Sequence, residues 1–194
     1  MNQHLDKQSK KLLRKSITDP LTGAYNRTGA SQYIKAAQDE LKSKDLGFSM
    51  IFLDIDHFKS INDTYGHDAG DKVLIELSAL MQKNIRASDS FIRWGGEEFV
   101  IICRYTQINE AKRVAEKLRE LISTSIHIGE RVITSSFGVV EINETSETAM
   151  NEAFKAVDIA LYQAKSTGRN KVVIVEPTDK SESEPFCTTV DFKE

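Results

Sequence analysis

Four acidic side chains in two separate segments are the best candidates for chemistry in this sequence. Asp54 and Asp56 end the apolar run FSMIFLDID, and a pair of glutamates follows two glycines in FIRWGGEEF. Alternate residues of a strand share a face, so the two aspartates could project together, although ordinary exposure at a strand end explains them equally well. Adjacent carboxylates repel one another unless a positive charge lies between them. Because Mg²⁺ prefers carboxylate oxygens with room for water and phosphate, we expect a Mg²⁺ site where Asp54 meets Glu97 or Glu98.

Two further polar segments carry groups suited to a nucleotide. In KSINDTYGHDAGD, Asn62 and Asp71 match the edge of guanine, because Asp accepts from N1 and N2 while Asn donates to O6 or N7. Both residues could instead cap helices. In AKSTGRNK, Lys165 and Arg169 could hold phosphates, or they could cap the end of a helix that Gly168 terminates.

The two glycines between the acidic segments also need a reason. Glycine weakens the interior of a strand and often marks a bulge or a close approach by another group. Gly95 and Gly96 stand inside an otherwise apolar hairpin. We therefore expect the phosphates or base of a nucleotide to approach the backbone at this turn.

Composition limits the classes of partner. The chain has 194 residues, 40% of them hydrophobic, with a net charge of −3, so it lacks the general basic surface that a nucleic acid requires. It has neither an apolar signal-peptide core nor a run approaching the ~20 apolar residues of a membrane span. Cys103 and Cys187 lie in dissimilar surroundings, which argues against a structural disulfide. We expect a soluble, cytoplasmic protein without membrane contact of its own.

The hydrophobic pattern predicts one α+β domain between two tails. Helices are expected over residues 26–43, 70–86, 107–124 and 150–166. Strands are expected over residues 48–56, 131–142 and 171–175, with a hairpin of 90–94 and 97–104 around the glycines. This βαββαβ order predicts a central sheet containing antiparallel strands, with helices on one face. Residues 1–17 are expected to form a linker or coiled-coil helix, 18–176 the folded domain, and 177–194 a flexible acidic tail.

Four ordered segments together resemble the GGDEF family of diguanylate cyclases. DPLTGAYNR is similar to D-x-L-T-G-x-x-N-R, and LDIDHFKSINDTYGHDAGDKVL resembles D-x-D-x-F-K-x-x-N-D-x-x-G-H-x-x-G-D-x-x-L at every fixed position. RWGGEEF is the signature hairpin in its Glu form. VDIALYQAKSTGRNKV resembles the closing A-D-x-A-L-Y-x-A-K-x-x-G-R-N, with Val157 where alanine is usual. The resemblance covers Asp19 to Val175, and motifs that mark other nucleotide-binding or hydrolytic families are absent from the sequence.

The resemblance implies a nucleotidyl cyclase or polymerase palm-like fold with helices around the sheet. It also implies condensation of two GTP into the signalling molecule cyclic di-GMP, with loss of two pyrophosphates. Each domain would hold one GTP and two Mg²⁺, for which Mn²⁺ could substitute. Two domains would face each other as a homodimer, so that each 3′-hydroxyl attacks the other α-phosphate.

The family pattern also implies a role for each matching residue. Asp54, Glu97 and the backbone carbonyl of Ile55 would bind Mg²⁺. Glu97 would act as base for the 3′-hydroxyl, and Glu98 would support metal or hydroxyl. The remaining matches would contact substrate: Asn62 and Asp71 at guanine, His67 at the ribose or base, and Lys59, Lys165 and Arg169 at the phosphates.

A short element upstream of the hairpin resembles the family's inhibitory site. RASD, Arg86 to Asp89, matches R-x-x-D at the usual distance from Gly95. Arg86 would pair with a guanine edge of cyclic di-GMP, and Asp89 would accept its N1 and N2 hydrogens. The alternative is a helix-ending arginine followed by an ordinary turn acid.

Three other functions compete with a cyclase for this sequence. A catalytically silent receptor for GTP or cyclic di-GMP would lack hairpin or metal residues, all of which are present here. A cyclase with relaxed base choice conflicts with Asp71, because a carboxylate repels the N1 lone pair of adenine. An interaction domain with an acidic hairpin would leave the four ordered motifs to coincidence.

Overall fold

The computed structural model describes residues 16–44 and 47–175. The predicted helix over residues 3–17, apart from its last two residues, and the predicted tail over 177–194 lie outside the described residues. Within the described part of the chain, no helix combines the length and apolarity needed to cross a bilayer.

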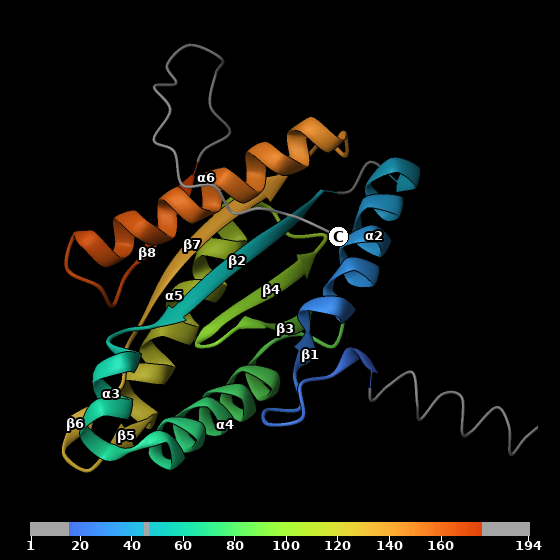
Figure 1. Ribbon diagram of the computed structural model, residues 1–194. Coiled ribbons are helices and arrows are strands. Elements are labelled where there is room, and N and C mark those ends of the chain that lie inside the picture. The colour runs from blue at the N-terminus through green and yellow to red at the C-terminus, as the bar shows by residue number, and fades with distance from the viewer. Residues whose placement is uncertain (1–15, 45–46, 176–194) are drawn as a thin grey trace, which may run out of the picture.

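A six-stranded mixed sheet forms the centre of the domain (Figure 1). Its strands, from one edge to the other, are β1 (Tyr25–Asn26), β3 (Ser90–Gly95), β4 (Glu98–Arg104), β2 (Phe48–Ile55), β7 (Ser135–Ile142) and β8 (Val172–Val175). Strand β2 pairs antiparallel with both neighbours, β4 and β7, while the outermost strands pair parallel with theirs. The predicted α+β class and the antiparallel centre of the sheet are confirmed.

Helices cover both faces of this sheet. One face carries α2 (Arg27–Lys44) and α6 (Glu147–Ser166), and the other carries α3 (Phe58–Tyr65), α4 (His67–Asn84) and α5 (Ile108–Ser125) (Figure 1). The prediction of helices on one face is therefore wrong. Strand β2 explains why: it is buried along its whole length, with Met50 and Phe52 in one apolar cluster and Ile51 and Leu53 in the other. An apolar run without alternation needs cover on both sides.

Several elements differ from the predicted boundaries. The polar segment before residue 70 forms α3 and the first turn of α4, separated by Gly66 at φ 85°. Buried residues are sparse in α3, where only Phe58 and Ile61 reach the core, so its helical pattern is weak in the sequence. The strand expected over 131–142 is divided into β6 (Arg131–Val132), which forms a small hairpin with β5 (His127–Ile128), and β7. The other predicted helices and strands are confirmed to within about three residues.

Candidate active site

A pocket of about 190 Å³ lies where β2 ends and α3 begins. The hairpin turn and the end of α6 close it from two other directions. Its lining includes seven of the residues singled out above: Asp54, Ile55, Asp56, Lys59, Glu97, Lys165 and Arg169. Residues more than a hundred positions apart in the chain therefore meet at one end of the sheet.

The hairpin turn separates its two glutamates. Asp54 lies opposite Glu98 in the β2–β4 register, and the Ile55 N–H donates to the Glu97 carbonyl at 3.4 Å. Gly96 turns the chain with φ 49°, a left-handed conformation that glycine adopts without strain. Glu97 consequently lines the small pocket, while Glu98 lines a larger cavity on the other side of the hairpin.

Asp54 is buried at the end of β2, and its carboxyl group is strongly perturbed. Its Oδ2 lies 2.7 Å from the Lys165 ammonium on α6. Loss of hydration on burial raises the pKa of Asp54 from 3.8 to about 6; Lys165 offsets this rise in part, and repulsion from Glu97 and Glu98 adds to it. A divalent cation at this carboxylate would therefore relieve both the lost hydration and the repulsion.

Asp56 has a different role from Asp54. Its carboxylate accepts hydrogen bonds from the Thr134 hydroxyl at 2.7 Å, the Ser136 hydroxyl at 2.6 Å and the Asn170 backbone N–H at 3.0 Å. These bonds tie the end of β2 to β7 and to the loop after α6. That loop carries Arg169 at φ 60°, so Asp56 helps to hold a predicted phosphate ligand in place.

An arginine clamp holds the hairpin turn from the opposite side. The Arg93 Nε and Nη2 donate to the Gly96 carbonyl at 2.9 and 2.8 Å, and its Nη1 donates to Asp19 Oδ1 at 3.0 Å. Asp19 Oδ1 also accepts from the Thr22 N–H and hydroxyl at 2.9 and 2.7 Å. The turn at the start of the domain is thus joined to the backbone next to Glu97.

Asn62 and Asp71 lie where α3 packs on α4. A Cβ on Gly70 would stand 2.0 Å from Asn62 Oδ1, so the amide lies against bare backbone beside Asp71. The N-caps of the two helices are His57 and Gly66. The alternative that Asn62 and Asp71 are helix caps is therefore wrong, and their side chains remain available to a ligand.

His67 and the RASD element lie away from the small pocket. His67 is the exposed first residue of α4. Arg86 and Asp89 line a separate pocket of about 380 Å³, together with Thr18 and Tyr25 from the start of the domain. Asp89 Oδ2 accepts from the Arg86 backbone N–H at 3.2 Å, which closes the turn. Burial raises the pKa of Asp89.

The donor groups of the small pocket fit Mg²⁺. Asp54, Glu97 and the Ile55 carbonyl would supply hard oxygen ligands, which suit Mg²⁺. Among the described residues, no group of three or more acidic, histidine or cysteine side chains could enclose an ion. Mg²⁺ typically uses one or two carboxylates and completes its shell with water and phosphate oxygens.

Comparison with known proteins agrees with this geometry. Residues 16–171 match the family described as "Diguanylate cyclase, GGDEF domain". The chain belongs to the GGDEF family. The response regulator PleD of Caulobacter vibrioides is 41% identical to this GGDEF domain over 170 residues, which are 83% of this chain and 36% of PleD.

Two further relatives support the assignment. The diguanylate cyclase DgcP of Pseudomonas aeruginosa is 38% identical over 178 residues, which are 89% of this chain and 25% of DgcP. The crystal structure of the coiled coil and GGDEF domain of DgcB from Caulobacter crescentus, in complex with c-di-GMP, has a TM-score of 0.81 at 27% identity and covers 89% of this chain and 93% of that one. The predicted palm-like fold is confirmed. This GGDEF domain spans between 25% and 36% of PleD and DgcP.

Two structural contributions were missed in the sequence. One is the anchoring by Asp56, and the other is the clamp of Arg93 and Asp19. Asp56, Arg93 and Asp19 all stand inside the motifs quoted above. Arg93 and Asp19 are 74 positions apart in the sequence, however, and Asp56 and Asn170 are 114 positions apart. The motif spacing was the only available signal, and it did not identify the partners.

Proposed function

We propose that two copies of this domain condense two GTP molecules into cyclic di-GMP and release two pyrophosphates. The observation that carries the proposal is the meeting of Asp54, Glu97 and Lys165 in one pocket beside α3. DgcP, by its name, is a diguanylate cyclase. The clustering of a perturbed carboxyl, a second acid and basic groups is the pattern of a phosphoryl-transfer site.

The residues of the pocket divide the work of the proposed reaction. Asp54, Glu97 and the Ile55 carbonyl would hold Mg²⁺, which supplies positive charge to the α-phosphate and the attacking hydroxyl. Glu97 would accept the proton of the 3′-hydroxyl. Lys165, which lies 2.7 Å from Asp54, would contact the phosphates together with Lys59 and Arg169, which line the same pocket.

The packing of α3 on α4 supports a preference for guanine. Asn62 and Asp71 project from adjacent positions of the two helices. An Asp carboxylate accepts from N1–H and N2–H of guanine, whereas adenine presents a lone pair at N1. GTP is therefore the proposed substrate, and ATP should fail at this edge. His67 would lie at the ribose or base.

The direct test is incubation of the purified protein with Mg²⁺ and GTP, with ATP in parallel, at several protein concentrations. Chromatographic separation should show cyclic di-GMP from GTP alone, with a rate that rises more than linearly with protein because two half-sites must meet. The Glu152→Gln variant, which changes an exposed acid of α6 away from the pocket, is the control. Absence of product together with tight binding of added cyclic di-GMP would make the protein a receptor.

The pocket beside RASD is proposed as a site of product inhibition. Arg86 and Asp89 share it with Thr18 and Tyr25, so cyclic di-GMP bound there would contact the start of the domain. Arg86→Ala should leave the initial rate similar and raise the inhibitory concentration of cyclic di-GMP by at least about tenfold, as expected for loss of a charge-assisted bidentate contact. Progress curves with added product measure this change. An unchanged inhibitory concentration would remove the site from the mechanism.

A further inference from the structure

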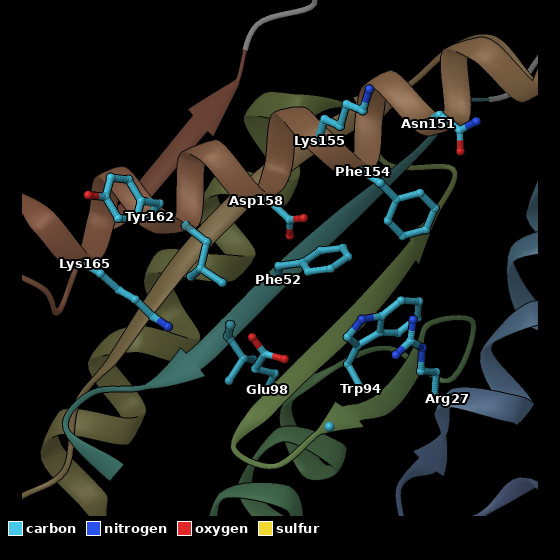
Figure 2. A pocket seen from close by; sticks show the side chains of 13 residues that line it. Arg27, Phe52, Trp94, Glu98, Asn151, Phe154, Lys155, Asp158, Tyr162 and Lys165 are labelled. Atoms are coloured by element: carbon cyan, nitrogen blue, oxygen red, sulfur yellow. The ribbon is translucent and has the colours of Figure 1, made fainter. Parts of the chain in front are cut away.

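The larger cavity on the other side of the hairpin has no role in the proposed reaction. It measures about 630 Å³ and lies between α6, β2 and the hairpin, with Arg27 of α2 at its edge (Figure 2). Lys165 and the hairpin border both this cavity and the small pocket. Its volume falls in the range of sites that bind small organic molecules.

One wall of this cavity is aromatic. The rings of Phe52, Trp94 and Phe154 have centroids 5.9 Å apart in each pair. The Arg27 guanidinium lies 5.0 Å from the centroid of Trp94 (Figure 2). The Trp94 and Phe154 rings lie at 25° to each other and Phe52 meets them at 60° and 83°, so the cluster gives the cavity an apolar wall against which a heteroaromatic ring can pack.

Two carboxylates line the same cavity. Asp158 of α6 and Glu98 of β4 point into the space beside the aromatic rings (Figure 2). Both remain accessible to solvent through the cavity, yet the surrounding protein removes enough hydration to raise the pKa of each. Among the described residues, Asp158 receives no hydrogen bond and forms no ion pair, and Glu98 is its charged neighbour. No described residue therefore competes with a ligand for the Asp158 carboxylate, which is open to solvent.

We propose that this cavity binds a guanine base, as part of a nucleoside or nucleotide, at a site separate from Asn62 and Asp71. The base would stack on the aromatic wall, and Asp158 would accept from its N1–H and N2–H. Arg27 and Lys165, at two edges of the cavity, provide positive charge for a phosphate. Adenine fits the same volume but faces Asp158 with a lone pair. The inference deepens the proposed function, since it rests on guanine nucleotides being the protein's ligands.

Trp94 provides a direct readout because it is the only tryptophan of the sequence and lines the cavity. Its fluorescence is followed during titration with guanosine, which has no triphosphate and cannot be turned over, and with adenosine in parallel. The variants are Asp158→Asn, which replaces one acceptor oxygen with a donor, and the double variant Asn62→Ala, Asp71→Asn, which disables the other guanine site. Glu152→Gln is the matched control on α6.

The expected result is a saturable change with guanosine and a change at least tenfold weaker with adenosine. The change should persist in the Asn62→Ala, Asp71→Asn variant and in Glu152→Gln, and its dissociation constant should rise at least tenfold in Asp158→Asn. Loss of the change in the double variant with no effect of Asp158→Asn would overturn the inference, because Trp94 would then report the other site. So would a lack of response to guanosine, or a fluorescence change that follows protein concentration, which would assign the cavity to a second copy. Failure of the cyclase assay alone would leave this titration unaffected.

Discussion

Asp54 and Asp56 lie two residues apart and are almost equally buried, with 6% and 5% of their surface exposed. Their surroundings differ completely. Asp56 accepts three hydrogen bonds from its neighbours, whereas Asp54 has one lysine and two nearby glutamates. Burial alone therefore does not distinguish a carboxylate that holds the structure from one that binds a ligand. What distinguishes them is the number of hydrogen-bond donors that the surrounding protein supplies to the carboxylate.

The largest effect on turnover is expected from substitution of Glu97, which lines the small pocket together with Asp54. Glu97→Gln should reduce turnover roughly 10²- to 10⁴-fold, as expected for loss of a general base, with further loss of metal affinity. Its unfolding temperature should remain that of the unmodified protein, because Glu97 is partly exposed in the turn. Steady-state rates and thermal unfolding, with Glu152→Gln in parallel, measure both. Unchanged turnover would remove Glu97 from the mechanism.

Substitution of Asp56 is expected to destabilise the protein. Asp56→Asn keeps one acceptor oxygen but turns an amide toward donors, so the free energy of unfolding should fall by about 2–4 kcal/mol. Denaturant titration measures this change. The control is Asp63→Asn on the exposed side of α3, which should change little. Equal midpoints for the two variants would show that the three hydrogen bonds at Asp56 contribute little.

Asp54→Asn, unlike Asp56→Asn, should raise the free energy of unfolding at neutral pH. The folded protein binds the Asp54 proton more tightly than the unfolded chain, since burial raises its pKa from 3.8 to about 6. The stability that this proton provides is complete below pH 3.8 and is lost as the pH rises through about 6. Above that pH the variant should be more stable by up to about 3 kcal/mol.

Denaturant titrations between pH 4 and 8 test this difference, without and with Mg²⁺. The difference in free energy of unfolding between Asp54→Asn and the unmodified protein should grow as the pH rises from 4 to 8. Added Mg²⁺ should reduce this difference, because it would stabilise only the unmodified protein. A variant that is less stable at every pH would indicate that the Lys165 ion pair, at 2.7 Å, outweighs the burial of the carboxylate.

A smaller effect is expected at the arginine clamp. Arg93→Lys keeps the charge but cannot donate to Gly96 and Asp19 at once, so the hairpin should lose its fixed position. We expect kcat to fall about tenfold, since small displacements near reacting groups are costly, with less change in KM. Asp19→Asn should reproduce the effect in weaker form. A fall in unfolding temperature with kcat unchanged would assign the clamp to stability alone.

Much of this site was predictable because its polar residues stand at the ends of helices and strands that have a clear hydrophobic pattern. The strand that ends in Asp54 and the hairpin that carries Glu97 were both expected, and so was their convergence. The short helix α3 was not expected, because only two of its residues reach the core. The anchoring by Asp56 and the link from Arg93 to Asp19 could not be predicted from local pattern, since each depends on which distant segments the sheet brings together.

The separation of Glu97 and Glu98 bears on the choice of inhibitors. The hairpin is a wall shared by two spaces, and Gly95 and Glu98 form its far side. A fragment lodged against that side would press on the turn without entering the small pocket. Compounds of this kind would reduce turnover without occupying the small pocket, and guanosine would compete with them for the larger cavity if it binds there as proposed.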